Sequence, residues 1–239
     1  MNWAVFAIGL VMVAFAIRDS LKNKKILPVI VTLSGVFCVI PEVFIKDIWS
    51  GHIKPASFDE GPFQITGNDM TWSYVVTWFA FGTAVTMICY TLISGNVKTK
   101  WLWTGLAVAV MADIIFEGIV INRHNLYVYY DFQPFLIWTG FPWWKMTTST
   151  TSLFLSAAIA FRYRELLDNW LSVLMFAITP VSYFAVHGVA GTSALLASKG
   201  NYSWSAGILI CALCMIIAAL TMQFILKRDP ANPEGKNFS

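Results

Sequence analysis

Long apolar stretches separated by short polar segments run along almost the whole chain. A helix that crosses a membrane needs about 20 consecutive, mainly apolar residues, and seven stretches approach or exceed that length. The pattern therefore predicts seven transmembrane helices. Their approximate bounds are 2–17, 26–49, 71–94, 101–122, 143–161, 170–189 and 203–226.

The first stretch is the shortest and resembles the apolar part of a signal peptide in length. It has no basic leader and no small-residue cleavage site, so we interpret it as a membrane helix.

The composition also favours a membrane protein. Hydrophobic residues make up 57% of the 239 residues and charged residues only 12%, whereas a soluble domain carries about 25% charged residues. We expect an all-α integral membrane bundle that forms one domain over residues 1–226. The polar, proline-containing tail, 227–239, is expected to be disordered and cytoplasmic.

The basic residues predict the orientation of the bundle. Cytoplasmic loops of membrane proteins are enriched in Lys and Arg, and 11 of the 16 Lys and Arg residues fall on one side of the predicted bundle. We therefore expect the N-terminus outside and the C-terminus in the cytoplasm, in the plasma membrane or the endoplasmic reticulum. The 11 residues are Arg18, Lys22, Lys24, Lys25, Lys98, Lys100, Arg162, Arg164, Lys227, Arg228 and Lys236.

Several carboxylates lie inside the apolar stretches, towards the predicted outer side. Asp113 and Glu117 are four residues apart, so both project from one helix face. Glu42 and Asp47 fall in the outer third of the second stretch, near Lys46. A charge at membrane depth costs roughly 2.5–3.5 kcal/mol, so such groups usually face the bundle interior or a wet cavity. Repulsion between Asp113 and Glu117 favours a proton on one of them, as a general acid requires.

The same residues also fit a structural role. The carboxylates at this depth could pair with Lys46, Arg123 or Lys145 and fix the helix register. Glu42 could pair with Lys46, which follows it by four residues. His187 lies at a similar depth on the sixth stretch, where a hydrogen-bonded structural histidine is the common alternative to a site residue.

A segment rich in aromatic residues follows the fourth stretch. Its rings could form an interfacial belt, or they could line a pocket for a lipophilic, oxygenated molecule or a carbocation. We expect eight residues to contact a substrate. They are Asp47, Asn122, Tyr129, Tyr130, Gln133, Trp143, Trp144 and His187.

Several motifs are absent from the sequence. The last stretch contains no lysine for a retinal Schiff base, and no DDxxD, GxSxG, HExxH, Walker or Rossmann motif occurs. The four cysteines all fall in predicted helices, where free thiols are ordinary buried residues. We therefore expect no cofactor and no metal site, and we expect proton transfer by carboxylates. The scattered basic residues argue against a nucleic-acid partner, and no obligate protein partner is evident.

An ordered set of motifs resembles the avermectin-type spirocyclases (AveC-like). An acid, Glu117, is followed by YVYYDFQP at 127–134 and by GFPWW at 140–144. The segment PEVFIKD at 41–47 resembles the first acidic motif of that family. The resemblance covers about 37–144. The chain departs from the family pattern at Asp131, where the family often has glycine, and at Pro41, which precedes Glu42 rather than following it.

The resemblance implies dehydration and spiroketal formation on a polyketide without a redox cofactor. We expect a membrane-embedded cyclase for a lipophilic precursor, in which Asp113 or Glu117 donates a proton and Glu42 acts as partner base or charge stabiliser. A membrane-bound meroterpenoid cyclase, which has a similar length and helix count and protonates an epoxide or alkene, is the first alternative. The second alternative is a transporter or a binding protein for a lipophilic ligand.

Overall fold

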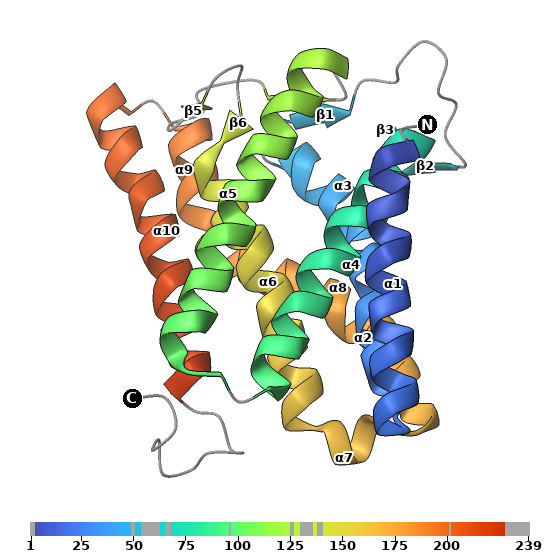
Figure 1. Cartoon of the computed structure of the whole chain (residues 1–239). Helices are drawn as coiled ribbons and strands as arrows, with labels where there is room; N and C mark the ends of the chain where they lie inside the picture. Colours follow the sequence, from blue (N-terminus) through green and yellow to red (C-terminus); the bar gives the residue numbers. More distant parts are fainter. Residues whose placement is uncertain are drawn as a thin grey trace.

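The computed structural model is a bundle of long helices that run roughly along one common direction (Figure 1). The structure describes residues 3–48, 51–53, 63–65, 68–95, 97–124, 127–129, 136–137, 141–200 and 202–227. Its α-helices are α1 (Trp3–Asn23), α2 (Leu27–Ser34), α3 (Val39–Ile48), α4 (Trp72–Ser94), α5 (Thr99–His124), α6 (Trp143–Arg162), α7 (Arg164–Leu167), α8 (Met175–Ala190), α9 (Thr192–Lys199) and α10 (Trp204–Lys227). Two 3-10 helices, η1 (Gly35–Cys38) and η2 (Trp170–Leu174), lead into α3 and α8.

Five helical segments of the described chain are long and apolar enough to cross a membrane. The predicted all-helical, membrane-type fold is confirmed at this level. The segments are Trp3–Asn23, Leu27–Ile45, Trp72–Ser94, Trp170–Ala190 and Trp204–Ile225.

Two further long helices, α5 and α6, occupy the remaining predicted stretches. α5 has 26 residues and α6 has 20. Thr and Ser occupy all of 147–152 in α6, and these polar residues lower the hydropathy of the helix. Its 20 residues are still enough to cross a membrane.

The structure differs from the predicted bounds at several places. The predicted stretch 26–49 is divided into α2, η1 and α3, and the short helix α7 follows α6. α1 continues to Asn23 instead of ending near Ile17, because Arg18 and Lys22 are good helix formers whose long side chains can reach polar surroundings from a helix end. A short helix that the apolar pattern did not predict, α9, lies between α8 and α10.

Helix α4 lies at the centre of the packing and contacts α1, α2, η1, α5 and α6. Its backbone approaches another one closely at Gly82, opposite Gly35 of η1. A Cβ atom added to either glycine would overlap backbone atoms of the other. The missing side chains therefore allow the two segments to pack backbone against backbone, as small residues do in membrane bundles.

Short strands pair at the end of the bundle where α3 and α5 finish. β1 (Gly51–Ile53) pairs antiparallel with β4 (Tyr127–Tyr129), so the segments that follow α3 and α5 are joined. The other ladders join β2 (Phe63–Ile65) to β3 (Asn68–Met70) and β5 (Leu136–Ile137) to β6 (Phe141–Pro142).

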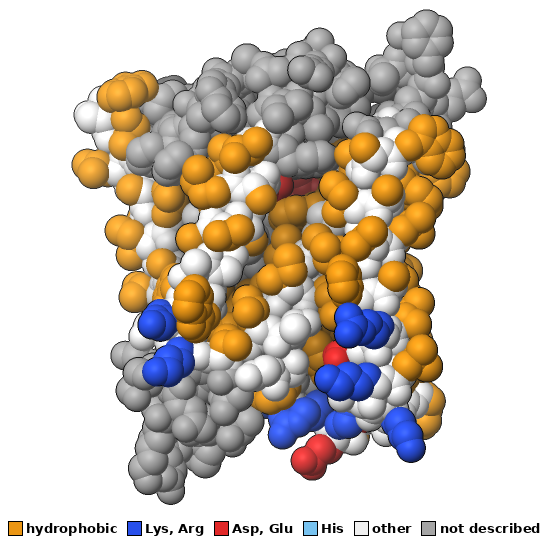
Figure 2. Space-filling view, viewed as in Figure 1, with side chains coloured by type: hydrophobic (Ala, Val, Ile, Leu, Met, Phe, Trp, Pro, Cys, Tyr) orange, Lys and Arg blue, Asp and Glu red, His pale blue; other side chains and the backbone are white. Residues whose placement is uncertain are grey.

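The side-chain distribution divides the surface into zones. Figure 2 shows apolar side chains along the flanks of the bundle and Lys and Arg side chains gathered at one end. Comparison with Figure 1 places this basic end where α1 finishes and α5 begins, opposite the strands. An apolar flank with polar ends is the distribution expected for a bundle surrounded by lipid.

The glycine contact predicts a selective effect on stability. Gly82→Ala should lower the free energy of unfolding by about 1–3 kcal/mol, because the new methyl group must push η1 away from α4. Gly188→Ala is the matched control, since nothing lies within 4 Å of a Cβ atom at that position. Unfolding of both variants in detergent micelles measures the effect, and equal stability of the two would contradict this packing.

Candidate functional site

Glu42 lies inside the bundle in the first turn of α3, with 2% of its surface exposed. Its carboxylate forms an ion pair with Lys145 through Oε1 and accepts a hydrogen bond from the Tyr183 hydroxyl at Oε2. Lys145 is also buried, at 3% exposed. Both oxygens of the carboxylate are therefore held by donors in surroundings that exclude water.

The partners of Glu42 come from two other helices. Lys145 is the third residue of α6, and Tyr183 lies near the middle of α8. α6 and α8 pack along each other, and α3 packs against α8. A buried charge is tolerated when it is paired and hydrogen-bonded, so these contacts make the position of each helix depend on the other two.

A second set of hydrogen bonds surrounds Tyr183. Its hydroxyl proton points to Glu42, so the Ser149 hydroxyl, at 2.9 Å, donates to the Tyr183 oxygen. The ring of His187 stacks on the ring of Tyr183 with centroids 4.1 Å apart. The Nε2 atom of His187 lies 3.0 Å from the Thr148 hydroxyl and Nδ1 lies 2.9 Å from the Tyr183 carbonyl oxygen. These contacts fix both rings.

Asp113 occupies a second environment, on α5. It is 4% exposed and lines a cavity of about 290 Å³ between α1, α4 and α5. The other residues that line this cavity are all apolar or glycine, among them Phe81, Val85 and Ala112. The volume is near the lower end of those found for small-molecule pockets, which are typically apolar with few polar groups.

The cavity opens towards the flank of the bundle. Ile8, Ile88 and Val108 line it and are each more than 40% exposed. A lipophilic molecule could therefore reach the carboxyl group of Asp113 sideways from the surrounding lipid.

Aromatic rings connect the cavity to the Glu42 site. Phe81 lines the cavity and meets Trp78 edge-on, with centroids 5.5 Å apart. Trp78 in turn meets the Tyr183 ring edge-on at 5.4 Å. The path from the cavity to the Glu42 ion pair is therefore filled by packed side chains of α4 and α8.

The other predicted site residues are placed to different extents. Trp144 is buried at 1% exposed, on the same turn of α6 as Lys145. Glu117 and Asn122 belong to α5, Asp47 to α3, Tyr129 to β4 and Trp143 to α6, but their side chains lie outside the described part of the structure. Tyr130 and Gln133 lie outside the described residues altogether.

Tyr183, Thr148 and Ser149 were not predicted from the sequence as residues of the site. Two signals were available. Tyr183 and His187 are four residues apart and so share one face of a helix. The run TTSTTS at 147–152 is unusual for a membrane helix, and its hydroxyls at 148–152 are all buried.

Lys145 was predicted as one possible partner of the carboxylates at this depth, and the structure joins it to Glu42 in an ion pair. The expected pairing of Glu42 with Lys46 involves a lysine side chain outside the described part.

The described residues include His, Cys, Asp and Glu side chains that are able to bind metal ions. No group of three or more His, Cys, Asp or Glu side chains there lies close enough together to hold a metal ion. Cys38, Cys89, Cys211 and Cys214 are buried free thiols.

Comparison of the chain with known protein families, with curated proteins and with solved structures found no match.

The buried ion pair predicts a distinctive pattern of stability changes. Lys145→Met should lower the free energy of unfolding by about 3–5 kcal/mol, because it leaves the Glu42 carboxylate buried without its cation. The double variant Glu42→Gln, Lys145→Met removes both charges and should recover much of that loss. Unfolding in detergent micelles measures all variants.

The matched control is Lys25→Met, which removes a partly exposed ion pair with Asp168 at 3.5 Å. It should cost less than about 1 kcal/mol. If the loss of unfolding free energy in Glu42→Gln, Lys145→Met equalled the sum of the losses in the two single variants, Glu42 and Lys145 would not be coupled, which would contradict the ion pair.

Proposed function

We propose that the chain is a multi-pass membrane protein with seven crossings, its N-terminus outside and its C-terminus in the cytoplasm. The five segments that meet the criteria for a span, together with α5 and α6, account for the seven. α1 begins and α10 finishes at opposite ends of the bundle, as an odd number of crossings requires (Figure 1). The basic end of the surface then faces the cytoplasm.

We further propose that the protein is a cyclase that closes rings in a lipophilic natural-product precursor. The observation that carries this proposal is the apolar cavity with one buried carboxyl group, Asp113. Such a cavity suits an apolar substrate with a single group to be protonated, because the walls bind the hydrocarbon part and leave one acid at the reacting atom.

The two carboxyl groups have different surroundings and suit different roles. Asp113 lines the apolar cavity and is the proton donor. Glu42 is paired with Lys145 and is separated from the cavity by the packed rings of Trp78 and Tyr183, so its role is to fix the packing of α3, α6 and α8. The acid in the segment that resembles the spirocyclases is Glu117, which follows Asp113 by four residues on α5.

Spiroketal formation from a dihydroxy ketone illustrates the chemistry. One hydroxyl oxygen bonds to the carbonyl carbon while Asp113 protonates the carbonyl oxygen. The proton of the attacking hydroxyl then passes to the Asp113 carboxylate, which gives a hemiketal and restores the acid. Protonation of the new hydroxyl by Asp113 releases water and leaves an oxocarbenium ion, to which the second hydroxyl oxygen bonds. That hydroxyl returns a proton to the carboxylate, so one water is lost and no electrons are exchanged. The redox balance therefore requires no oxidant or reductant.

A membrane-bound terpene cyclase is the second candidate, and the rings beside the cavity favour it. Phe81 lines the same cavity as Asp113, and aromatic rings stabilise carbocations. In this reaction Asp113 would protonate an epoxide or alkene of a prenylated arene. The two candidates share the acid and differ in the substrate.

Product analysis tests the proposal. Membranes that contain the wild type should convert a dihydroxy ketone polyketide or an epoxyprenyl arene into a cyclic product detectable by mass spectrometry. Asp113→Asn should lower turnover by about 10²–10⁴-fold, because it keeps the size of the side chain and removes the acid. Glu165→Gln is the control, since it neutralises an exposed carboxylate on α7. Full turnover by folded Asp113→Asn protein would overturn the assignment of the acid.

The cavity itself can be tested by filling it. Ala112→Phe should reduce turnover by about tenfold or more, because the ring occupies space beside Asp113 that the substrate needs. Ala219→Phe makes the same change on an exposed position of α10 and should leave turnover unchanged. Equal activities of the two variants would place the substrate elsewhere.

A further inference from the structure

A second cavity lies between α1 and α4, nearer the basic end of the bundle. Its volume is about 430 Å³. Apolar side chains form one part of its lining, and polar and charged side chains form the other. The apolar residues are Met12, Phe15, Met87, Ile88 and Leu92, and the remaining ones are Arg18, Asp19, Lys22 and Thr91.

The charged part lies at the depth of lipid headgroups. α1 is one of the segments that could cross a membrane, starting at Trp3. With a rise of 1.5 Å per residue, Arg18 and Lys22 lie roughly 22 and 28 Å along the helix axis from Trp3. The hydrocarbon core of a bilayer is about 30 Å thick. Lys22 therefore lies at the boundary between the acyl chains and the phosphates, and Arg18 lies one turn deeper, from where its long side chain can extend to that boundary. The apolar part of the cavity is within the hydrocarbon.

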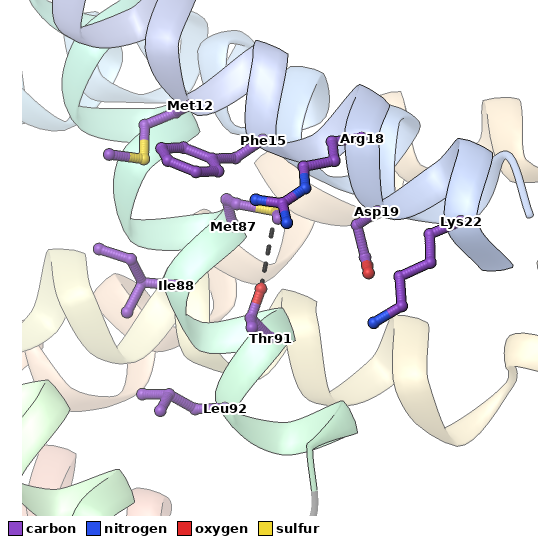
Figure 3. A pocket seen from close by; sticks show the side chains of 9 residues that line it. All are labelled: Met12, Phe15, Arg18, Asp19, Lys22, Met87, Ile88, Thr91 and Leu92. Carbon is purple, nitrogen blue, oxygen red and sulfur yellow. Dashed lines mark hydrogen bonds between the residues drawn. The ribbon is translucent and has the colours of Figure 1, made fainter.

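The side chains of this cavity favour an anion at its polar end. Figure 3 shows the Arg18 guanidinium extending towards Thr91 and the Lys22 ammonium reaching into the same space. The one carboxylate in the lining, Asp19, accepts a hydrogen bond of 2.7 Å from the Asn23 side chain. Two cations thus face the cavity against one anion.

The apolar end suits an acyl chain. Phe15 and Ile88 are partly exposed to the surroundings, whereas Met87 is buried and forms the floor. Methionine and phenylalanine give an adaptable apolar surface. A ligand with one charged phosphate and a hydrocarbon chain would match both ends of this cavity, which we call the groove between α1 and α4.

We propose that the groove between α1 and α4 binds one anionic phospholipid, with its phosphate at Arg18 and Lys22 and an acyl chain along Phe15, Met87 and Ile88. The proposal requires that α1 crosses the membrane, and it does not depend on the cyclase proposal, because Asp113 lines a different cavity.

Native mass spectrometry of the delipidated full chain in detergent tests the lipid site. Phosphatidylglycerol should bind in a 1:1 complex, and phosphatidylcholine with the same acyl chains should bind at least about tenfold more weakly. The double variant Arg18→Gln, Lys22→Gln should weaken phosphatidylglycerol binding by about tenfold or more, since each cation near a membrane surface contributes roughly 1 kcal/mol.

The matched control is Lys98→Gln, Lys100→Gln. It removes the same charge from exposed positions at the same end of the bundle but outside the groove. This control should bind phosphatidylglycerol like the wild type. Equal losses in the two double variants would mean diffuse attraction by the basic end and would overturn the site.

A steric variant tests the apolar part independently of charge. Thr91→Trp should fill the groove and lower phosphatidylglycerol binding by a similar factor, with both cations still present. Equal binding of phosphatidylcholine and phosphatidylglycerol to the wild type would overturn the preference for a net negative headgroup. If inorganic phosphate displaced phosphatidylglycerol and Thr91→Trp bound this lipid as well as the wild type does, the acyl chain would have no role in binding.

Discussion

The ion pair between Glu42 and Lys145 constrains how α3, α6 and α8 can pack. Both charges are buried, so any arrangement that separated them would leave a charge in apolar surroundings, at a cost of several kcal/mol. The Tyr183 hydroxyl occupies the second carboxylate oxygen, and His187 and Ser149 fix the tyrosine in turn. Apolar side chains alone would allow these helices to slide past each other, whereas the polar contacts select one register.

The same bundle separates three chemical environments. A paired carboxylate lies between α3, α6 and α8, a carboxyl group lies in an apolar cavity beside α4 and α5, and cations line a groove at the basic end. α4 borders both cavities, and its close contact with η1 at Gly82 holds it against the N-terminal helices. Ile88 lines both cavities, so the wall between the two lipophilic spaces is a single layer of side chains.

The hydrophobic pattern predicted the helices well because length and hydropathy decide which segments a bilayer accepts. The pattern failed at α9 and at the end of α1, where short or charged segments remain helical for local reasons. It placed Glu42, Asp113 and His187 inside the bundle correctly. It offered Lys145 as a partner of the buried carboxylates without saying which one it joins, because Glu42 and Lys145 are 103 positions apart and only the tertiary packing brings them together. The spacing rule favoured Lys46 because such a rule applies within one helix.

Infrared difference spectroscopy tests most directly whether Glu42 is a charged carboxylate inside the bundle. Spectra of the wild type and of Glu42→Gln, both reconstituted in bilayers at neutral pH, isolate the signal of this one side chain. The ion pair with Lys145 predicts that the difference contains the symmetric and antisymmetric stretches of an ionised carboxylate, and that Lys145→Met shifts them. A carbonyl stretch of a protonated carboxylic acid in the wild type, unchanged by Lys145→Met, would contradict it.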